Sequence, residues 1–176
     1  MSRVGGDAQI KAMKKVAGGL KLALSQYRDL EAFASFASDL DAVSRAQLDR
    51  GGRLVELLKQ PQYSPLAVEQ QVITVWAGTS GLLDDVPVED IRRFESEFLD
   101  QLRRDKSGIL DAIRETGELS DDTITALKDA IEEFRRGFET SGGDLLVVDE
   151  EPAEAVDESK VSQEKVARRV PQAEKK

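Results

Sequence analysis

The chain has 176 residues, enough for one modest domain, and its net charge of −9 argues against a general nucleic-acid binder. It contains no cysteine and no histidine, which excludes disulfides, thiolate or imidazole metal ligands and the usual base of a neutral-pH hydrolase. No apolar run approaches the roughly 18 residues that span a bilayer, so we expect membrane association only through partner proteins.

The first predicted helix covers residues 8–37. Its apolar residues, Ile10, Leu24 and Phe33 among them, recur at steps of three and four, which places one apolar stripe along one face. Gly18 and Gly19 lie inside this pattern, and each costs about 1 kcal/mol relative to alanine. The glycine pair therefore predicts a kink or a break in the helix.

A second helix is predicted after Ser38, because the serine oxygen can accept hydrogen bonds from unpaired amides at a helix start. Asp41, three residues later, would oppose the positive end of the helix dipole. The helix carries a leucine stripe that consists of Leu48, Leu54, Leu57 and Leu58. Together the two helices predict an antiparallel pair with an acidic tip.

Four further helices follow in the sequence. Ser64 and Pro65 predict the start of the third, which ends near residues 78–81. The fourth begins after residues 84–87, the fifth stops at Gly117, and Ser120 caps the sixth. Because no alternating run of useful length occurs, the predicted fold class is all-α, a bundle of about six helices.

The sequence changes character after residue 142. Residues 149–158 contain six acids and no base, whereas residues 160–176 contain six bases and two acids. Few large apolar residues follow residue 148, and their burial cannot offset the entropy lost when the segment becomes ordered. We therefore expect residues 142–176 to form a mobile acidic-then-basic tail. The apolar run 144–148 is the exception, since it could dock as a strand or onto a groove.

Nucleotide chemistry is constrained by what the sequence lacks. No G-x-x-x-x-G-K-[ST] loop is present to hold the phosphates of a nucleotide. Neither histidine nor cysteine is available as a base or nucleophile. An independent enzyme is therefore disfavoured. Two hypotheses stay open: one part of a larger machine, or a stand-alone helical interaction module with no nucleotide role.

Several motifs extend over most of the predicted helical body. They are Ser2-Arg3-Val4-Gly5-Gly6, the helix–turn–helix of residues 24–65 ending in Gln60-Pro61-Gln62-Tyr63-Ser64-Pro65, Phe94-Glu95-x-x-Phe98-Leu99 and Phe134-x-x-x-Phe138. In these motifs the sequence resembles the carboxy-terminal portion of the alpha subunit of F-type ATP synthases. Leu82 departs from the pattern, since many members have tyrosine there. The long tail resembles that of actinobacterial alpha subunits, which suggests an inhibitory effect on ATP hydrolysis.

The resemblance implies roles for five residues. Arg3 would reach in trans toward the γ-phosphate held by a neighbouring beta subunit, a task that suits the planar guanidinium. Gln60 and Gln62 would lie near the adenine of the non-catalytic nucleotide site, and Asp39 and Asp41 would face the rotating central stalk. Taken without the resemblance, all five are ordinary surface residues. A metal site at the two aspartates is the weakest option, because no third ligand accompanies them.

The resemblance also implies a context. Residues 1–18 would end a nucleotide-binding domain, and residues 19–141 would form the carboxy-terminal helical domain. The expected partners are the beta, gamma and delta subunits of a bacterial, proton-transporting ATP synthase at the cytoplasmic face of the plasma membrane. ATP or ADP with magnesium is expected in the complete complex, and no cofactor is expected for the isolated chain. The chain looks like the last third of a subunit, whose amino-terminal domains it lacks.

Overall fold

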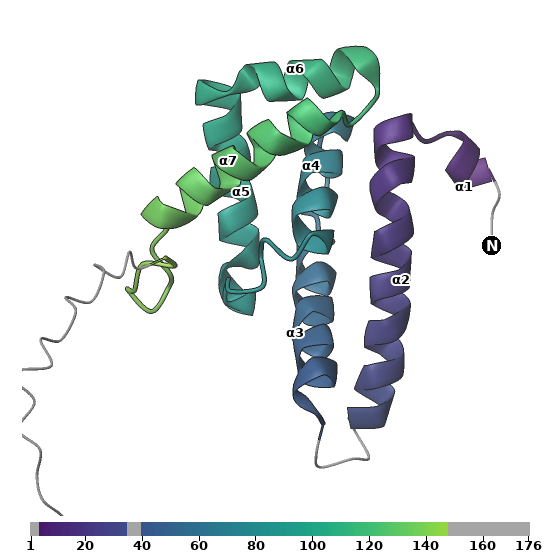
Figure 1. Ribbon diagram of the computed structural model, residues 1–176, viewed down its shortest axis with the longest axis vertical. Coiled ribbons are helices and arrows are strands. Elements are labelled where there is room, and N and C mark those ends of the chain that lie inside the picture. Colours follow the sequence, from purple (N-terminus) through teal and green to yellow (C-terminus); the bar gives the residue numbers. More distant parts are fainter. Residues whose placement is uncertain (1–3, 35–39, 148–176) are drawn as a thin grey trace, which may run out of the picture.

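The computed structural model describes residues 4–34 and 40–147. Within them every regular element is a helix, and the only β pairing is an isolated bridge between Glu139 and Leu145 (Figure 1). The predicted all-α fold class is therefore confirmed. The elements, in chain order, are α1 Val4–Asp7, α2 Lys11–Ala34, α3 Ala42–Leu57, α4 Val68–Thr79, the 3-10 helix η1 Val88–Asp90, α5 Ile91–Asp105, α6 Ser107–Thr116 and α7 Asp121–Gly137.

Helix α2 starts later than predicted. A short α1 and a turn precede it, and the Ala12 amide near its start donates to the Gly117 carbonyl at 2.9 Å. The predicted kink at Gly18 and Gly19 is wrong, because α2 continues through both glycines. The packing of α2 against α3 and α4 stabilises the helix and offsets the low helix propensity of the two glycines. Ala12 and Val16 of α2 belong to the core. The proposed domain boundary at residue 18 falls inside this helix.

Helices α2 and α3 form the predicted antiparallel pair (Figure 1). They approach closely at Gly51, where an added Cβ would lie 2.3 Å from Cδ2 of Tyr27. The N-cap of α3 is Asp41, whose side chain accepts from the Ser44 amide at 2.8 Å. The predicted cap, Ser38, lies outside the described residues.

The predicted start of the third helix at Ser64 and Pro65 is wrong. Helix α4 begins three residues later, with Ala67 as its N-cap. The cause is a turn in which the Ser64 amide donates to the Pro61 carbonyl at 3.4 Å and Tyr63 adopts a φ of 61°. Residues 64–66 therefore stay outside the helix, which begins only at Val68.

The later helices match their predicted boundaries. Gly117 ends α6 in the left-handed conformation (φ 65°), which glycine adopts without a steric penalty. The Ser120 hydroxyl caps α7 by accepting from the Thr123 amide at 3.2 Å. These two residues fix the short connection between α6 and α7.

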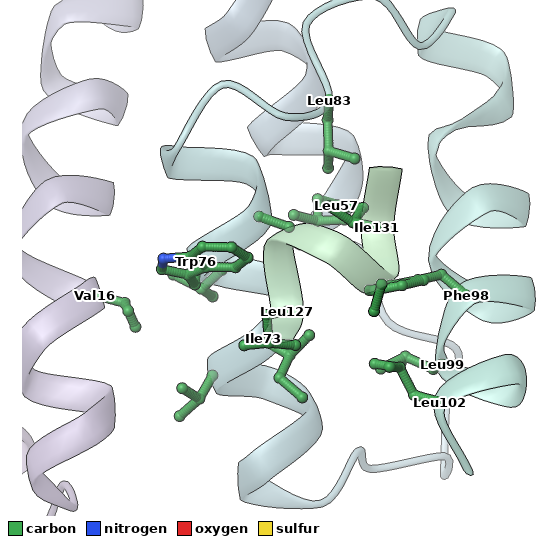
Figure 2. Packing of buried hydrophobic residues seen from close by; sticks show 14 of the residues in the cluster. Val16, Leu57, Ile73, Trp76, Leu83, Phe98, Leu99, Leu102, Leu127 and Ile131 are labelled. Carbon is green, nitrogen blue, oxygen red and sulfur yellow. The ribbon is translucent and has the colours of Figure 1, made fainter. Parts of the chain in front are cut away.

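One apolar core joins α2 and α4 to α7 (Figure 2). Trp76 of α4 lies between Val16 of α2 and the rest of the cluster. Leu102 of α5 and Ile131 of α7 belong to the same cluster. The apolar side chains of α5 that recur at steps of three and four are buried; they are Ile91, Phe94, Phe98 and Leu102. The core thus sets the positions of the loop after α3 and of the exposed face of α5.

The chain folds back after α7. Phe138 is buried, and its carbonyl accepts from the Leu146 amide at 2.9 Å, while Leu146 packs against the core. The described part of the apolar run therefore pairs in a strand-like manner, one of the two placements that the sequence left open. Val148 and the residues after it lie outside the described residues.

Candidate functional site

A groove of about 770 Å³ lies between the loop that joins α3 to α4 and the adjoining face of α5. Both charged and apolar side chains line it. The loop side contributes Lys59, Gln60, Pro61, Ser64, Pro65 and Leu66, and α5 with the end of η1 contributes Glu89, Arg92, Arg93, Glu95, Ser96, Leu99 and Arg103. A concave surface with a few convergent polar groups is the usual form of a ligand site.

The loop wall has a defined backbone. Its turn places Tyr63 in the left-handed region, an uncommon conformation for a non-glycine residue. The Tyr63 side chain is 93% exposed, so no packing within the described chain explains the strain. Gln60 and Gln62 are both exposed, but only Gln60 is among the residues that line the groove. The structure thus separates the two glutamines that the sequence treats alike.

The opposite wall is one face of α5. Arg92, Ser96, Leu99 and Arg103 recur at steps of three and four, so they lie on one side of the helix. This face is the signal by which the sequence could have revealed the second wall. The second wall was not predicted, because the polar side of an amphipathic helix ordinarily faces solvent.

Glu95 is the one carboxyl of the groove with a strongly raised pKa. Burial raises the pKa of Glu95 to about 7, although the Arg92 charge and a hydrogen bond with Thr74 act in the opposite direction. The groove therefore holds a carboxyl group that changes its charge near neutral pH. Such a group is a candidate for ligand recognition, or a consequence of packing α5 against α4.

Asp41 lies far from the groove. It caps the N-terminus of α3, whereas Gln60 follows the C-terminus of this 16-residue helix, about 24 Å away at 1.5 Å per residue. The hydrogen bond from the Ser44 amide lowers the pKa of Asp41, so the carboxylate serves the helix cap. Arg3 and Asp39 lie outside the described residues, and their predicted roles stay predictions.

The described ranges contain no group of three or more acidic side chains placed to hold a metal ion. None of the helices in residues 4–34 and 40–147 is long and apolar enough to cross a membrane.

Within the described residues the fold is all-helical and presents a groove, and the sequence contains no phosphate-loop motif. The family model for the ATP synthase alpha/beta chain, C terminal domain, matches residues 9–134. The chain belongs to this family.

Curated relatives agree along nearly the whole chain. It is 66% identical to ATP synthase subunit alpha of Thermobifida fusca over 94% of this chain and 30% of the relative. For the same subunit of Acidothermus cellulolyticus the identity is 61%, over 97% of this chain and 30% of the relative. For that of Mycolicibacterium smegmatis it is 60%, over 99% and 32%. The chain thus spans about a third of the length of these relatives and matches the C-terminal portion of the alpha subunit.

Proposed function

We propose that this chain forms the non-catalytic, regulatory C-terminal part of the alpha subunit in a proton-transporting F-type ATP synthase. The observation that carries the proposal is the match to ATP synthase alpha subunits over nearly the whole chain. The proposed partners are the beta, gamma and delta subunits, in a complex at the cytoplasmic face of the bacterial plasma membrane. Association with the membrane would then be indirect.

Assembly tests this proposal against the alternative, a stand-alone helical interaction module. A full-length alpha subunit of Thermobifida fusca is made with its C-terminal part replaced by this chain, and it is co-expressed with the other subunits. Co-purification of the chimera with beta and gamma supports the proposal. If the chimera is folded but excluded from the complex, the proposal is refuted and the module hypothesis is favoured. The native alpha subunit is the control.

Arg3 is the proposed contribution to chemistry. Its guanidinium would stabilise the charge that spreads over the phosphoryl oxygens at a neighbouring beta subunit. Arg3→Ala in the assembled chimera is expected to reduce ATP turnover by about 10³-fold while nucleotide binding stays nearly unchanged. Turnover close to that of the unsubstituted chimera would remove Arg3 from this role.

Gln60 and the groove are the proposed nucleotide-facing part of the chain. A side-chain amide can pair with the donor and acceptor edge of adenine, and the position of Gln60 on the groove wall supports this assignment more than that of Gln62. ATP or ADP with magnesium would bind only in the complete complex, since the phosphate loop must come from elsewhere.

The tail is the proposed regulatory element. Its basic end, with Arg168 and Arg169, could bind an acidic surface of the stalk and hinder rotation in the hydrolytic direction. Because Leu146 packs against the core, the appropriate deletion begins at Val148. Faster ATP hydrolysis with unchanged synthesis would support the regulatory role, and unchanged rates of both would refute it.

A further inference from the structure

The segment after α7 is held to the start of α5 by a compact network, here called the Asp90 clamp, which consists of Asp90, Arg93 and Ser141. The Asp90 side chain is only 1% exposed. It accepts a hydrogen bond from the Ser141 amide at 2.9 Å and another from the Ser141 hydroxyl. It also forms an ion pair with Arg93, whose Nη2 lies 3.1 Å from Oδ1. A buried carboxylate thus binds a residue 51 positions later in the sequence.

Arg93 adds a second attachment. Its guanidinium donates to the Glu139 carbonyl at 2.5 Å and lies 4.3 Å from the centre of the Phe138 ring. Phe138 itself is buried, and it packs edge-on against Phe94, with the two ring centres 5.0 Å apart. The contact between Phe138 and Phe94 therefore fixes the end of α7, and the clamp fixes the segment that follows α7.

Beyond the clamp, the segment is held by the Leu146 contact with the core and by backbone hydrogen bonds among its own residues and to Phe138. Residues 141–145 are exposed, and Leu146 is the apolar anchor that packs against the core. Gly142 and Gly143 lie in the turn, and Gly143 adopts a φ of 86°, a left-handed conformation that glycine allows. Few buried contacts and exposed backbone hydrogen bonds characterise the parts of proteins that open locally.

We propose that the Asp90 clamp is a conformational device: residues 139–147 open as one local unit while the helices stay folded, with Phe138 as the fixed point. In the closed state the clamp holds residues 139–147 against the start of α5. Control of the tail through this device rests on the proposed function, but opening itself does not.

Hydrogen exchange by NMR on the 176-residue chain tests the clamp without any partner subunit. In Asp90→Asn, the amides of Thr140 and Leu146 are expected to exchange about tenfold faster or more, because one charged acceptor is lost. The exchange of Ile131, a core amide, should stay unchanged. Ser141→Ala, which removes only the hydroxyl donor, should give a smaller change in the same direction.

The control is Asp100→Asn, which removes an exposed carboxylate paired with Arg103 on the same helix and should leave all these rates unchanged. The proposal is overturned if Thr140 and Leu146 exchange at wild-type rates in Asp90→Asn and Ser141→Ala. It is equally overturned if they accelerate by the same factor as Ile131, because the segment then opens only with the whole fold. Neither outcome bears on assembly of the alpha-subunit chimera, so the two proposals fail separately.

Discussion

The contact between α2 and α3 makes the most direct prediction about stability, because α3 has two adjacent glycines in different surroundings. A Cβ at Gly51 would lie 2.3 Å from Cδ2 and 2.5 Å from Cβ of Tyr27. The Cβ of Tyr27 is fixed by the backbone of α2, so a change of rotamer cannot remove this clash and the two helices must move apart. At Gly52 an added Cβ meets nothing within 4 Å.

The two alanine variants should therefore differ in sign. Gly52→Ala gains helix propensity and should raise the free energy of unfolding by about 0.5–1 kcal/mol. Gly51→Ala gains the same propensity but incurs overpacking of about 1–3 kcal/mol, for a net loss of up to about 2.5 kcal/mol. Movement of Tyr27 would also break the 3.0 Å hydrogen bond from its hydroxyl to Glu31.

Urea denaturation of the wild type and both variants measures these changes, since the shift in midpoint at constant slope reports stability. Gly52→Ala is the matched control, because it changes the same helix by the same methyl group. If Gly51→Ala stabilises the chain as much as Gly52→Ala does, the close approach of α2 and α3 at this point is wrong.

Three further predictions concern charge and ligand binding. Because the raised pKa lets folded Glu95 keep its proton after the unfolded chain has lost it, stability should fall as pH rises from 4.5 to about 7. Glu95→Gln should abolish this fall, which is on the order of 1 kcal/mol after allowance for solvent screening. Urea unfolding at several pH values measures it, and identical pH profiles of stability for the wild type and Glu95→Gln would contradict the prediction. Arg114→Ala should lower the melting temperature at pH 7, because it leaves the buried Glu69 carboxylate without the Arg114 Nη2 atom that lies 2.6 Å away. Burial opposes ionisation of Glu69, but the hydrogen bond from Arg114 keeps the pKa of Glu69 lowered. The loss of melting temperature in Arg114→Ala should therefore shrink as pH falls below the ordinary Glu pKa of 4.5. A loss at acidic pH as large as that at pH 7 would argue against this ion pair. In calorimetry the isolated chain should show no micromolar ATP binding, because Gln60 and Gln62 can address a base but nothing in the sequence cradles phosphates.

Local chemistry predicted much of the fold. Ser120 and Gly117 were assigned correctly because their capping interactions involve only neighbours in sequence. The predictions failed where contacts between distant segments decide. Helix α2 passes through Gly18 and Gly19 because α3 and α4 pack against it. The turn at Tyr63 delays α4, and nothing in the Ser64-Pro65 dipeptide reports that turn.

The candidate site was less accessible to sequence reasoning. Gln60 was singled out by resemblance alone, and the sequence could not separate it from Gln62, because only the folded loop places one of them in the groove. The pKa of Glu95 depends on how α5 packs against α4, a property of the assembled fold. The buried Asp90 carboxylate is likewise defined by its bonds to Ser141, a residue that follows α7.

The central claim is that this chain works as part of a rotary ATP synthase, and proton-driven ATP synthesis measures it most directly. Inverted membrane vesicles are prepared from cells whose alpha subunit carries this chain as its C-terminal part, with a subunit truncated before this part as the control. We predict ATP synthesis that requires a proton gradient in the chimera and none in the truncated control. Synthesis at the level of the truncated control, from a chimera that is present in the membranes, would contradict the claim.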